Sequence, residues 1–590
     1  MTPKCTGSEL PELWRAVEDR AVSWLAAHHG RFDPDAADET GVLFARKALV
    51  EVALLVGLRA RLDPAPFDPH YQQLFDRMAA VASRASYREL VGRDERALLL
   101  YAGTHAALRL CGHADREFQH LLEQSVAGRY AACFERIPYR QLDLLHTLEL
   151  AGVEHDMPGV EDVLPFTLLC ADPSVLKLGD RDIYAITHTL FYATDFGLRL
   201  PRWPIGFDLS RATELLEALC LLCRRRGNAD LVAELICSLL CLGIRDSAEA
   251  ERAWAFLADV QEPDGRVAGP DGIVHPGLEG SGEDHRSWAT AYHTTIVAAL
   301  AALLARSRAV IRRPRPEPPA ALDRAELESA LCRATVWLVE SAAVCPLDEA
   351  IPSVAAAVRG ARAVGEPELA HPAVTSLVGR VGAASEQALW GSHGADVVFE
   401  CAHGVTASGL SCPSLDRFLT DTADALAGVT VVPAAAAAGV GHLMRLGRLA
   451  PHTADSLLAS ADPAELRARS RPSAVVARDL AQYAGDEPSR IDSDDPGWYP
   501  VAERLAAALP DACRNYRLEE VAVLLGGLAL LGWADHRVTR DGLEFLLRQQ
   551  SPAGSFGFTA RDDPQERASA QRRWTQSCVV ALSHLVTVTG

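Results

Sequence analysis

The stretch Phe256–Gly265, with the sequence FLADVQEPDG, occurs a second time in altered form as Phe545–Gly554, with the sequence FLLRQQSPAG. In each copy an apolar helical pattern ends in Gln-x-Pro-x-Gly, and another helical pattern follows. Proline and glycine both end helices, so each copy predicts a sharp turn between two helices. The pair of copies therefore predicts one helical unit that is present twice.

Other short matches support this internal duplication. They join residues that are separated by about 290 to 310 positions throughout the chain. The matched pairs are Trp24-Leu25 with Trp337-Leu338, Tyr192-Ala193-Thr194-Asp195 with Tyr483-Ala484-Gly485-Asp486, Cys220 with Cys513, and Leu242-Gly243 with Leu531-Gly532. Separations this steady indicate one ancestral unit with a few changes in loop length.

A proline- and arginine-rich stretch, Arg312–Pro319 (RRPRPEPP), lies between the two copies. Such a sequence cannot continue a helix and is typical of a stiff linker. We therefore predict a first domain over residues 1–308, a linker over 309–320 and a second domain over 321–590.

Each predicted domain is a succession of helical patterns. Apolar residues recur at spacings of three and four in Leu215–Cys223, Leu231–Leu242, Ala250–Val260 and Val521–Leu531. Alternating strand patterns are not evident, so the predicted class is all-α. A unit of this length holds about 12 helices. A closed ring of inner and outer helices buries that many amphipathic faces economically, which predicts two tandem α/α toroids.

Composition limits the partners and the compartment. The net charge is −20, from 78 acidic and 58 basic residues, which argues against nucleic acid as a partner. Met1–Trp14 lacks the apolar core of a signal peptide, so we expect a cytoplasmic protein with reduced cysteines. Ala425–Met444 is strongly apolar, but Pro433 interrupts it and it carries His442. We expect it to be buried, and we predict no integral membrane segment.

The repeated motif also resembles a known family. In the second copy Gln-x-Pro-x-Gly is followed by Ser555-Phe556-Gly557. This is similar to the glutamine- and glycine-containing motif of squalene cyclases and protein prenyltransferases, and the resemblance implies an α/α toroid. The first copy departs from that pattern, because Arg266-Val267 stands where an aromatic residue is expected. Each half also resembles a family of uncharacterised bacterial helical proteins, which implies no activity.

A cluster of acidic residues gives the first candidate site. Asp492-Ser493-Asp494-Asp495 resembles the Asp-x-Asp-Asp motif with which class II terpene cyclases protonate an alkene or epoxide. The resemblance implies that Asp494 is the acid, with Asp492 and Asp495 supporting it. Pro496-Gly497-Trp498 follows in place of the family's Thr-Ala. The alternative interpretation is a solvated loop between helices.

A set of histidines gives the second candidate site. His188 and Asp195 stand seven residues apart on one predicted helix face, with Tyr192 between them, while His285 and His293 stand eight apart further along the chain. Two helices that present His and Asp inward could bind a divalent metal through His188, His285 and His293, or supply a general base. In the second domain the matched positions are Asp479 for His188 and Thr575 for His293. The histidines are thus special to the first domain.

Two cysteine-containing patterns have spacings similar to those of metal sites. Cys401-Ala402-His403-Gly404 with Cys412 is superficially similar to the Cys-His-Gly of the zinc-binding lanthionine cyclases, but the inserted alanine breaks the match. Cys220 and Cys223 with Cys237 and Cys241 lie in leucine-rich helical patterns, which favours core packing.

These features leave three hypotheses for function. The first is a terpene-cyclase-like enzyme of bacterial specialised metabolism that cyclises or rearranges an apolar, isoprenoid-like substrate. An aromatic content of only 6% counts against a long polyene substrate. The second is a natural-product tailoring enzyme that uses the His/Asp site, with or without a divalent metal, on a small molecule or peptide. The third is a non-catalytic helical binding or partner protein. A homodimer is possible under each.

Overall fold

The computed structural model describes residues 10–36, 42–93, 97–270, 282–319, 322–384, 388–468, 470–485, 487–560 and 562–589. The chain forms two compact units, Met1–Ser174 with Leu178–Pro319, and Val175–Lys177 with Ala320–Gly590. Within the described residues the elements are α-helices and short 3-10 helices, and no β-strand is present among them. The prediction of an all-α protein is confirmed.

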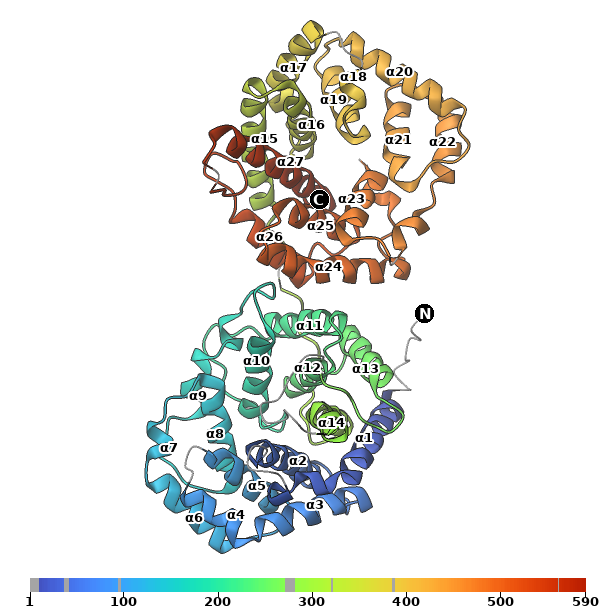
Figure 1. The fold of residues 1–590 in the computed structure, drawn as a ribbon. Coiled ribbons are helices and arrows are strands. Elements are labelled where there is room, and N and C mark those ends of the chain that lie inside the picture. The colour runs from blue at the N-terminus through green and yellow to red at the C-terminus, as the bar shows by residue number, and fades with distance from the viewer. Residues whose placement is uncertain are drawn as a thin grey trace. The chain divides into compact units, whose positions relative to one another are not determined.

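In the first unit the described helices include six that pack in sequence around a centre (Figure 1). Each contacts the next, and the last contacts the first, so they close into an inner ring. They are α2 (Val42–Leu62), α5 (Leu98–Leu110), α8 (Pro138–Ala151), α10 (Asp180–Ala193), α12 (Ala229–Cys241) and α14 (Glu283–Arg306). Outside them lie α1 (Leu10–Ala27), α3 (Pro69–Ala82), α4 (Ala85–Glu89), α6 (Arg116–Ala127), α7 (Tyr130–Cys133), α9 (Val160–Val163), α11 (Leu209–Arg225) and α13 (Ala248–Val260).

The second unit repeats this arrangement (Figure 1). Its inner ring is also closed by a contact between its first and last helices. The inner helices are α16 (Leu347–Ala363), α19 (Ala395–Ala407), α21 (Ala437–Arg445), α23 (Ser473–Ala484), α25 (Leu518–Leu530) and α27 (Pro564–Val588). Outside them lie α15 (Arg324–Val344), α17 (His371–Ala384), α18 (Ala388–Gly391), α20 (Pro413–Ala427), α22 (Pro451–Ser460), α24 (Tyr499–Arg514) and α26 (Arg537–Leu547).

The repeated motif makes the same hydrogen bonds in both units. The Gln261 side-chain amide donates to the carbonyls of Val17, at 3.1 Å, and Gly265, at 2.9 Å. The Gln550 amide donates to the carbonyls of Ala330, at 2.8 Å, and Gly554, at 3.2 Å. The glutamine thus ties the turn after α13 to α1, and the turn after α26 to α15. Descent from one ancestral unit stays a prediction.

Both motif glycines are required by the close approach of the neighbouring helix. Gly265 has a φ of 100°, and a Cβ there would lie 2.1 Å from the carbonyl oxygen of Arg20 on α1. Gly554 has a φ of 105°, and its Cβ would lie 2.2 Å from the carbonyl oxygen of Arg333 on α15. Other residues rarely adopt this backbone conformation, so glycine permits both the turn and the helix contact.

The predicted linker is packed along the first unit. The amide of Ile311 donates to the carbonyl of Gly197 at 2.9 Å, and that of Arg313 donates to the carbonyl of Gly243 at 2.8 Å. Arg315 pairs with Glu217 at 2.8 Å. Residues 309–319 therefore belong to the first unit, and the boundary follows Pro319.

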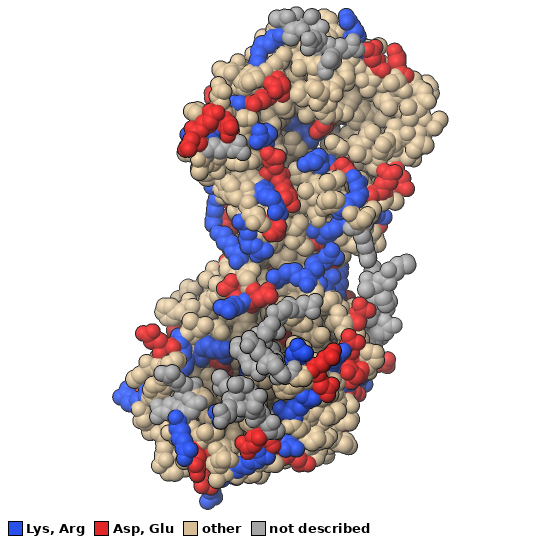
Figure 2. Space-filling model, in the orientation of Figure 1, with Lys and Arg blue, Asp and Glu red and all other residues tan. Residues whose placement is uncertain are grey.

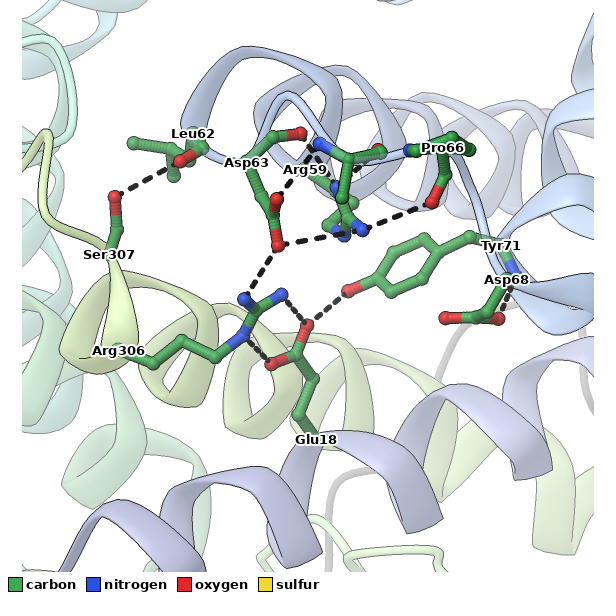
Figure 3. A network of polar contacts seen from close by, with 10 residues as sticks. Glu18, Arg59, Leu62, Asp63, Pro66, Asp68, Tyr71, Arg306 and Ser307 are labelled. Carbon is green, nitrogen blue, oxygen red and sulfur yellow. Dashed lines mark hydrogen bonds and ion pairs between the residues drawn. The ribbon is translucent and has the colours of Figure 1, made fainter.

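A buried polar network joins four helices of the first unit (Figure 3). Glu18 on α1 accepts hydrogen bonds from Arg306 on α14, at 3.0 Å, and from the Tyr71 hydroxyl on α3, at 2.9 Å. Arg306 also donates to Asp63 at 2.8 Å, directly after α2. Arg59 lies 3.5 Å from Asp63 on its other side. This network fixes α1, α2, α3 and α14 at the point where the ring closes.

The two strongly apolar segments are buried to different extents. Among the described residues one helix, Glu283–Arg306, is long and apolar enough to span a membrane, but 89% of its apolar window is buried in the protein. Its composition is accounted for by its place in the inner ring. The stretch Ala425–Met444 is divided between the end of α20 and α21. In Ala425–Met444, residues 437–443 are largely buried but residues 427–431 are exposed, so the expectation of a buried stretch holds only in part. On the face drawn in Figure 2, acidic and basic residues are interspersed over both units.

Candidate functional site

The inner ring of the first unit encloses a cavity of about 480 Å³. All six inner helices contribute side chains to its wall. Cavities of this size hold small-molecule ligands in many proteins. The polar residues of the wall are Lys47, Glu51, Arg140, Asp143, His146, Thr147, Tyr184, His188, Tyr192, Glu234 and His293.

Three side chains at the cavity have the geometry of metal ligands. Asp230 and Glu234 lie one turn apart on α12, and His293 faces them from α14. The Nε2 atom of His293 is 3.8 Å from Asp230 Oδ1 and 3.8 Å from Glu234 Oε1. These distances are too long for hydrogen bonds. Two ligands bound to one ion at about 2.1 Å in a tetrahedral arrangement lie about 3.4 Å apart, so the separations suit a shared cation.

Glu234 has an unused oxygen. Its side chain is 1% exposed, and the Thr187 hydroxyl donates to its Oε2 atom at 2.6 Å. Its Oε1 atom, which faces His293, makes no hydrogen bond. A buried carboxylate oxygen without a partner is costly, because it has lost the hydration that stabilised it. Within this cluster the missing partner is a donor or a cation.

A second carboxylate lies at ion-pair distance from His293, without the geometry of a hydrogen bond. Glu51 Oε2 on α2 lies 3.2 Å from His293 Nδ1, and Glu51 Oε1 lies 3.3 Å from the Lys47 ammonium. Nδ1 of the imidazole thus faces a carboxylate while Nε2 faces Asp230 and Glu234. Metal-binding histidines in proteins usually carry such a carboxylate on the nitrogen that does not bind the metal.

The charges of this cluster shift the pKa values of its members. Burial raises the pKa of Glu234, and the charge of Asp230 adds to the increase. Burial alone would lower the pKa of His293, but the charges of Glu51 and Asp230 raise it well above its usual value. Without a cation the cluster therefore retains a proton on His293 to balance its carboxylates.

His188 faces the same cavity from α10. Its ring stacks on Tyr184 with centroids 3.6 Å apart, and its Nδ1 donates to the Tyr184 carbonyl at 3.0 Å. Nε2 is then the basic nitrogen of the neutral ring. Burial lowers the pKa of His188 well below its usual value, and the charges of Arg140 and His293 lower it further. His188 is therefore neutral at pH 7 and has the protonation state of a general base.

The structure separates the predicted metal residues. His293 lies in the cluster, and Nδ1 of His188 is 3.7 Å from Glu234. His285 is two turns before His293 and bonds to Arg31, with its Nδ1 atom 3.2 Å from the guanidinium. It does not line the cavity. Of the three predicted ligands, only His293 belongs to the group that the structure brings together, which is Asp230, Glu234 and His293.

Asp195 is placed behind the cavity wall. It accepts two hydrogen bonds from Arg61, at 2.7 and 2.5 Å, and its Oδ1 lies 2.9 Å from His146 Nε2. Its side chain is 9% exposed. The carboxylate of Asp195 faces its ion-pair partners and lies outside the cavity lining, which favours a structural role, and its catalytic role stays a prediction.

The acidic tetrad is an exposed loop of the second unit. Asp492 and Asp494 are exposed, and the amide of Asp494 donates to the Asp492 carboxylate at 3.2 Å. Asp495 caps a short 3-10 helix through the amide of Gly497, at 2.8 Å, and pairs with Arg467. A carboxyl group needs burial to remain protonated as a strong acid. The exposed position of Asp494 favours the alternative interpretation of a solvated loop, and the acid role implied for it stays a prediction.

Sequence reasoning missed Glu51, Asp230 and Glu234. Asp230 and Glu234 are acidic residues four apart on a helix that is otherwise strongly apolar. A charged residue inside such a helix indicates a buried partner or ligand. For Glu234 this signal could have been found by examining Leu231–Leu242 for exceptions to its apolar pattern, whereas Asp230 stands in the first turn of the helix, where acidic residues are common.

The second unit lacks the cluster. The Thr295 hydroxyl accepts from the amide of Val267, and the Thr575 hydroxyl accepts from that of Phe556, both at 2.9 Å directly after the motif. Counting from these two threonines, His293 corresponds to Arg573, which corrects the earlier match with Thr575. Asp230 and Glu234 correspond to Glu519 and Val523 through the motif spacing. Arg573 and Glu519 form an ion pair of 3.6 Å.

The cysteine patterns are part of the core. Cys220, Cys223, Cys237 and Cys241 are buried, and burial raises the pKa of each thiol. Cys401 is also buried and donates to the carbonyl of Ile351 at 3.5 Å. These thiols are packing residues, as the helical patterns favoured.

One comparison with known proteins gives a match. The model of a family described as a domain of unknown function (DUF6895) matches residues 18–303. The matched region spans almost the whole first unit, and it contains Asp230, Glu234 and His293. No curated protein and no solved structure matches the chain significantly.

Proposed function

We propose that the first unit is a metal-dependent enzyme that acts on a small molecule in its ring cavity. Asp230, Glu234 and His293 are the metal ligands in this proposal. Of the activities expected from the sequence, the His/Asp tailoring enzyme is the one that this cavity supports, with a corrected set of ligands.

The observation that carries the proposal is that the Oε1 atom of Glu234 makes no hydrogen bond. It is buried and faces the Nε2 atom of His293 at 3.8 Å. The presence of Glu51 on the other nitrogen of His293 supports the same conclusion. One imidazole and two carboxylates suit zinc, iron(II) and manganese(II), because all three accept mixed nitrogen and oxygen ligands.

The neighbouring residues support a catalytic role for the cavity. A divalent ion would polarise a carbonyl or phosphoryl oxygen of the substrate or lower the pKa of a bound water. His188 is neutral and faces the cavity, so its Nε2 atom can accept a hydrogen bond from a substrate or a bound water. Tyr184 and Tyr192 keep their protons, because burial raises their pKa values well above the usual range, and they can donate hydrogen bonds.

The test is metal binding by the full chain. The protein is stripped with EDTA and titrated with Zn²⁺ or Mn²⁺ in a calorimeter. We expect one tight site, and we expect Glu234→Gln and His293→Gln each to weaken it by at least about 100-fold, since a ligand is lost. Glu519→Gln is the matched control, because Glu519 occupies the position of Asp230 in the second unit.

Two results would count against the proposal. One is a stripped protein that binds neither ion. The other is a site that is weakened as much by Glu519→Gln as by Glu234→Gln.

A further inference from the structure

We infer that the cavity of the first unit binds an amphipathic anion, a molecule with an apolar body and one carboxylate or phosphate head group. The inference rests on the proposed function, because it names the class of substrate held beside Asp230, Glu234 and His293. The order of polar and apolar residues along the inner helices supports it.

The cavity has a polar end and an apolar end. Each inner helix is followed by outer segments that return the chain, so successive inner helices run in the same direction. On four of them charged or hydrogen-bonding wall residues precede apolar wall residues by one or two turns. These sets are Lys47 and Glu51 before Leu54, Arg140 and Asp143 before Leu150, Tyr184 and His188 before Phe191, and His293 before Ile296 and Leu300. The polar His146, Thr147 and Tyr192 lie further along α8 and α10, and the apolar Val50 lies before Glu51 on α2.

Contacts between helices place the polar residues at one level. Glu51 on α2 meets His293 on α14, and His188 on α10 lies 3.7 Å from Glu234 on α12. The guanidinium of Arg140 on α8 lies 5.9 Å from the ring centre of Tyr184 on α10. The polar end therefore contains both cationic side chains of the wall and the proposed metal ligands.

Lys47 and Arg140 are the residues that would hold the anionic head. Lys47 pairs with Glu51 at 3.3 Å, and Arg140 pairs with Asp143 at 3.2 Å. An ammonium has three donors and a guanidinium has five, so each retains donors beyond its carboxylate partner. Their side chains are 45% and 43% exposed, respectively, while they line the cavity. They can therefore bind an oxyanion without losing their partners.

The remaining wall suits an apolar body. α5 contributes only apolar residues and glycine to the cavity, among them Leu99, Leu100 and Leu110. Ile296 and Leu300 of α14 continue this surface beyond His293. A ligand whose head lies between Lys47 and Arg140 thus places its apolar part against α5 and α14. Its first atoms after the head lie beside the metal ligands, where the chemistry would occur.

The experiment is a calorimetric titration of the full chain with decanoate, decyl phosphate and 1-decanol, each in EDTA and again with Mn²⁺. We expect at least one of the two anions to bind at least tenfold more tightly than decanol. The double variant Lys47→Gln/Arg140→Gln should lose this preference while its decanol affinity is unchanged, which also shows that its cavity is folded. Arg129→Gln is the control, because Arg129 is 71% exposed and does not line the cavity. It should keep the preference.

Equal binding of decanol and both anions would overturn the inference, and so would an anion preference that survives in the double variant. Failure of all three probes to bind would overturn it as well. The anion preference in EDTA needs no metal, and its loss in the double variant would assign it to Lys47 and Arg140. A chain that binds no metal but keeps the preference therefore contradicts the proposed function and supports this inference. A chain that binds metal but shows no anion preference supports the proposed function and contradicts this inference.

Discussion

Replacement of Gly265 by alanine tests how the repeated motif stabilises the first unit. The new Cβ would lie 2.1 Å from the Arg20 carbonyl oxygen, so α1 would have to retreat by about 1 Å to restore an ordinary contact. Forcing bulk into a packed contact costs about 1–3 kcal/mol. The φ of 100° adds a backbone cost of about 1–3 kcal/mol for a residue other than glycine. We expect a total loss of about 4 kcal/mol in the free energy of unfolding.

Differential scanning calorimetry of the full chain is the assay, because it can resolve the transitions of two units. A loss of about 4 kcal/mol lowers the midpoint of a unit of this size by about 6 °C, because the entropy of unfolding is about 2.1 cal/mol/K per residue. Gly30→Ala is the matched control, because a Cβ at Gly30 would have no atom within 4 Å. If Gly265→Ala and Gly30→Ala unfold within about 2 °C of each other, the close approach of the motif to α1 is not what requires glycine.

Two further substitutions test the buried ion pairs of the first unit. Asp195→Asn should lower the free energy of unfolding by about 3 kcal/mol at pH 7, because it breaks a buried ion pair, and a denaturant titration measures this loss. It should leave the metal affinity unchanged, which calorimetry measures. Burial alone would raise the pKa of Asp195, but His146 and Arg61 lower it, so its stabilisation is present above about pH 4 and is lost as pH falls through the depressed pKa. The difference between wild type and Asp195→Asn should therefore shrink below pH 4, and a difference that stays constant to pH 2 would contradict the assignment. Arg306→Met should cost about 3–5 kcal/mol, since it leaves Glu18, which is 4% exposed, without its cation. Arg93→Met is the control, because the side chains of its ion pair are 72% and 60% exposed, and it should lower the free energy of unfolding by less than about 1 kcal/mol. Equal losses in Arg306→Met and Arg93→Met would refute the account of the network in Figure 3.

The fold class could be predicted from the sequence because its signals are local. Helical periodicity and the turn residues of Gln-x-Pro-x-Gly depend on near neighbours along the chain. The tie from Gln261 to Val17 could be anticipated only as a contact with some neighbouring helix, because its partner lies at the other end of the unit. The linker was predicted as separate, since its sequence does not show that Arg313 pairs with the backbone of Gly243.

The candidate site could be predicted only in part because its members come from different helices. His188 and His293 were found as histidines peculiar to the first unit. Glu51 and Glu234 were not found, because ring closure is what brings α2, α12 and α14 together. His285 was included wrongly, since a helix spacing of eight leaves it two turns from His293 and outside the cavity.

The comparison between units was also affected by loop length. The connection between the motif and the next helix differs in length, so the match of His293 to Thr575 was wrong. The hydrogen bonds of Thr295 and Thr575 give the correct register. With that register, the unit without the histidine is also without the buried glutamate, since Arg573 and Val523 stand in place of His293 and Glu234.

The metal content of the full chain, measured by elemental analysis after purification without chelators, tests the central claim most directly. We predict close to one transition-metal ion per chain in the wild type and in Glu519→Gln, and almost none in Glu234→Gln. Wild-type protein without metal that also fails to take up added Zn²⁺, Mn²⁺ or Fe²⁺ would contradict the claim that Asp230, Glu234 and His293 form a metal site.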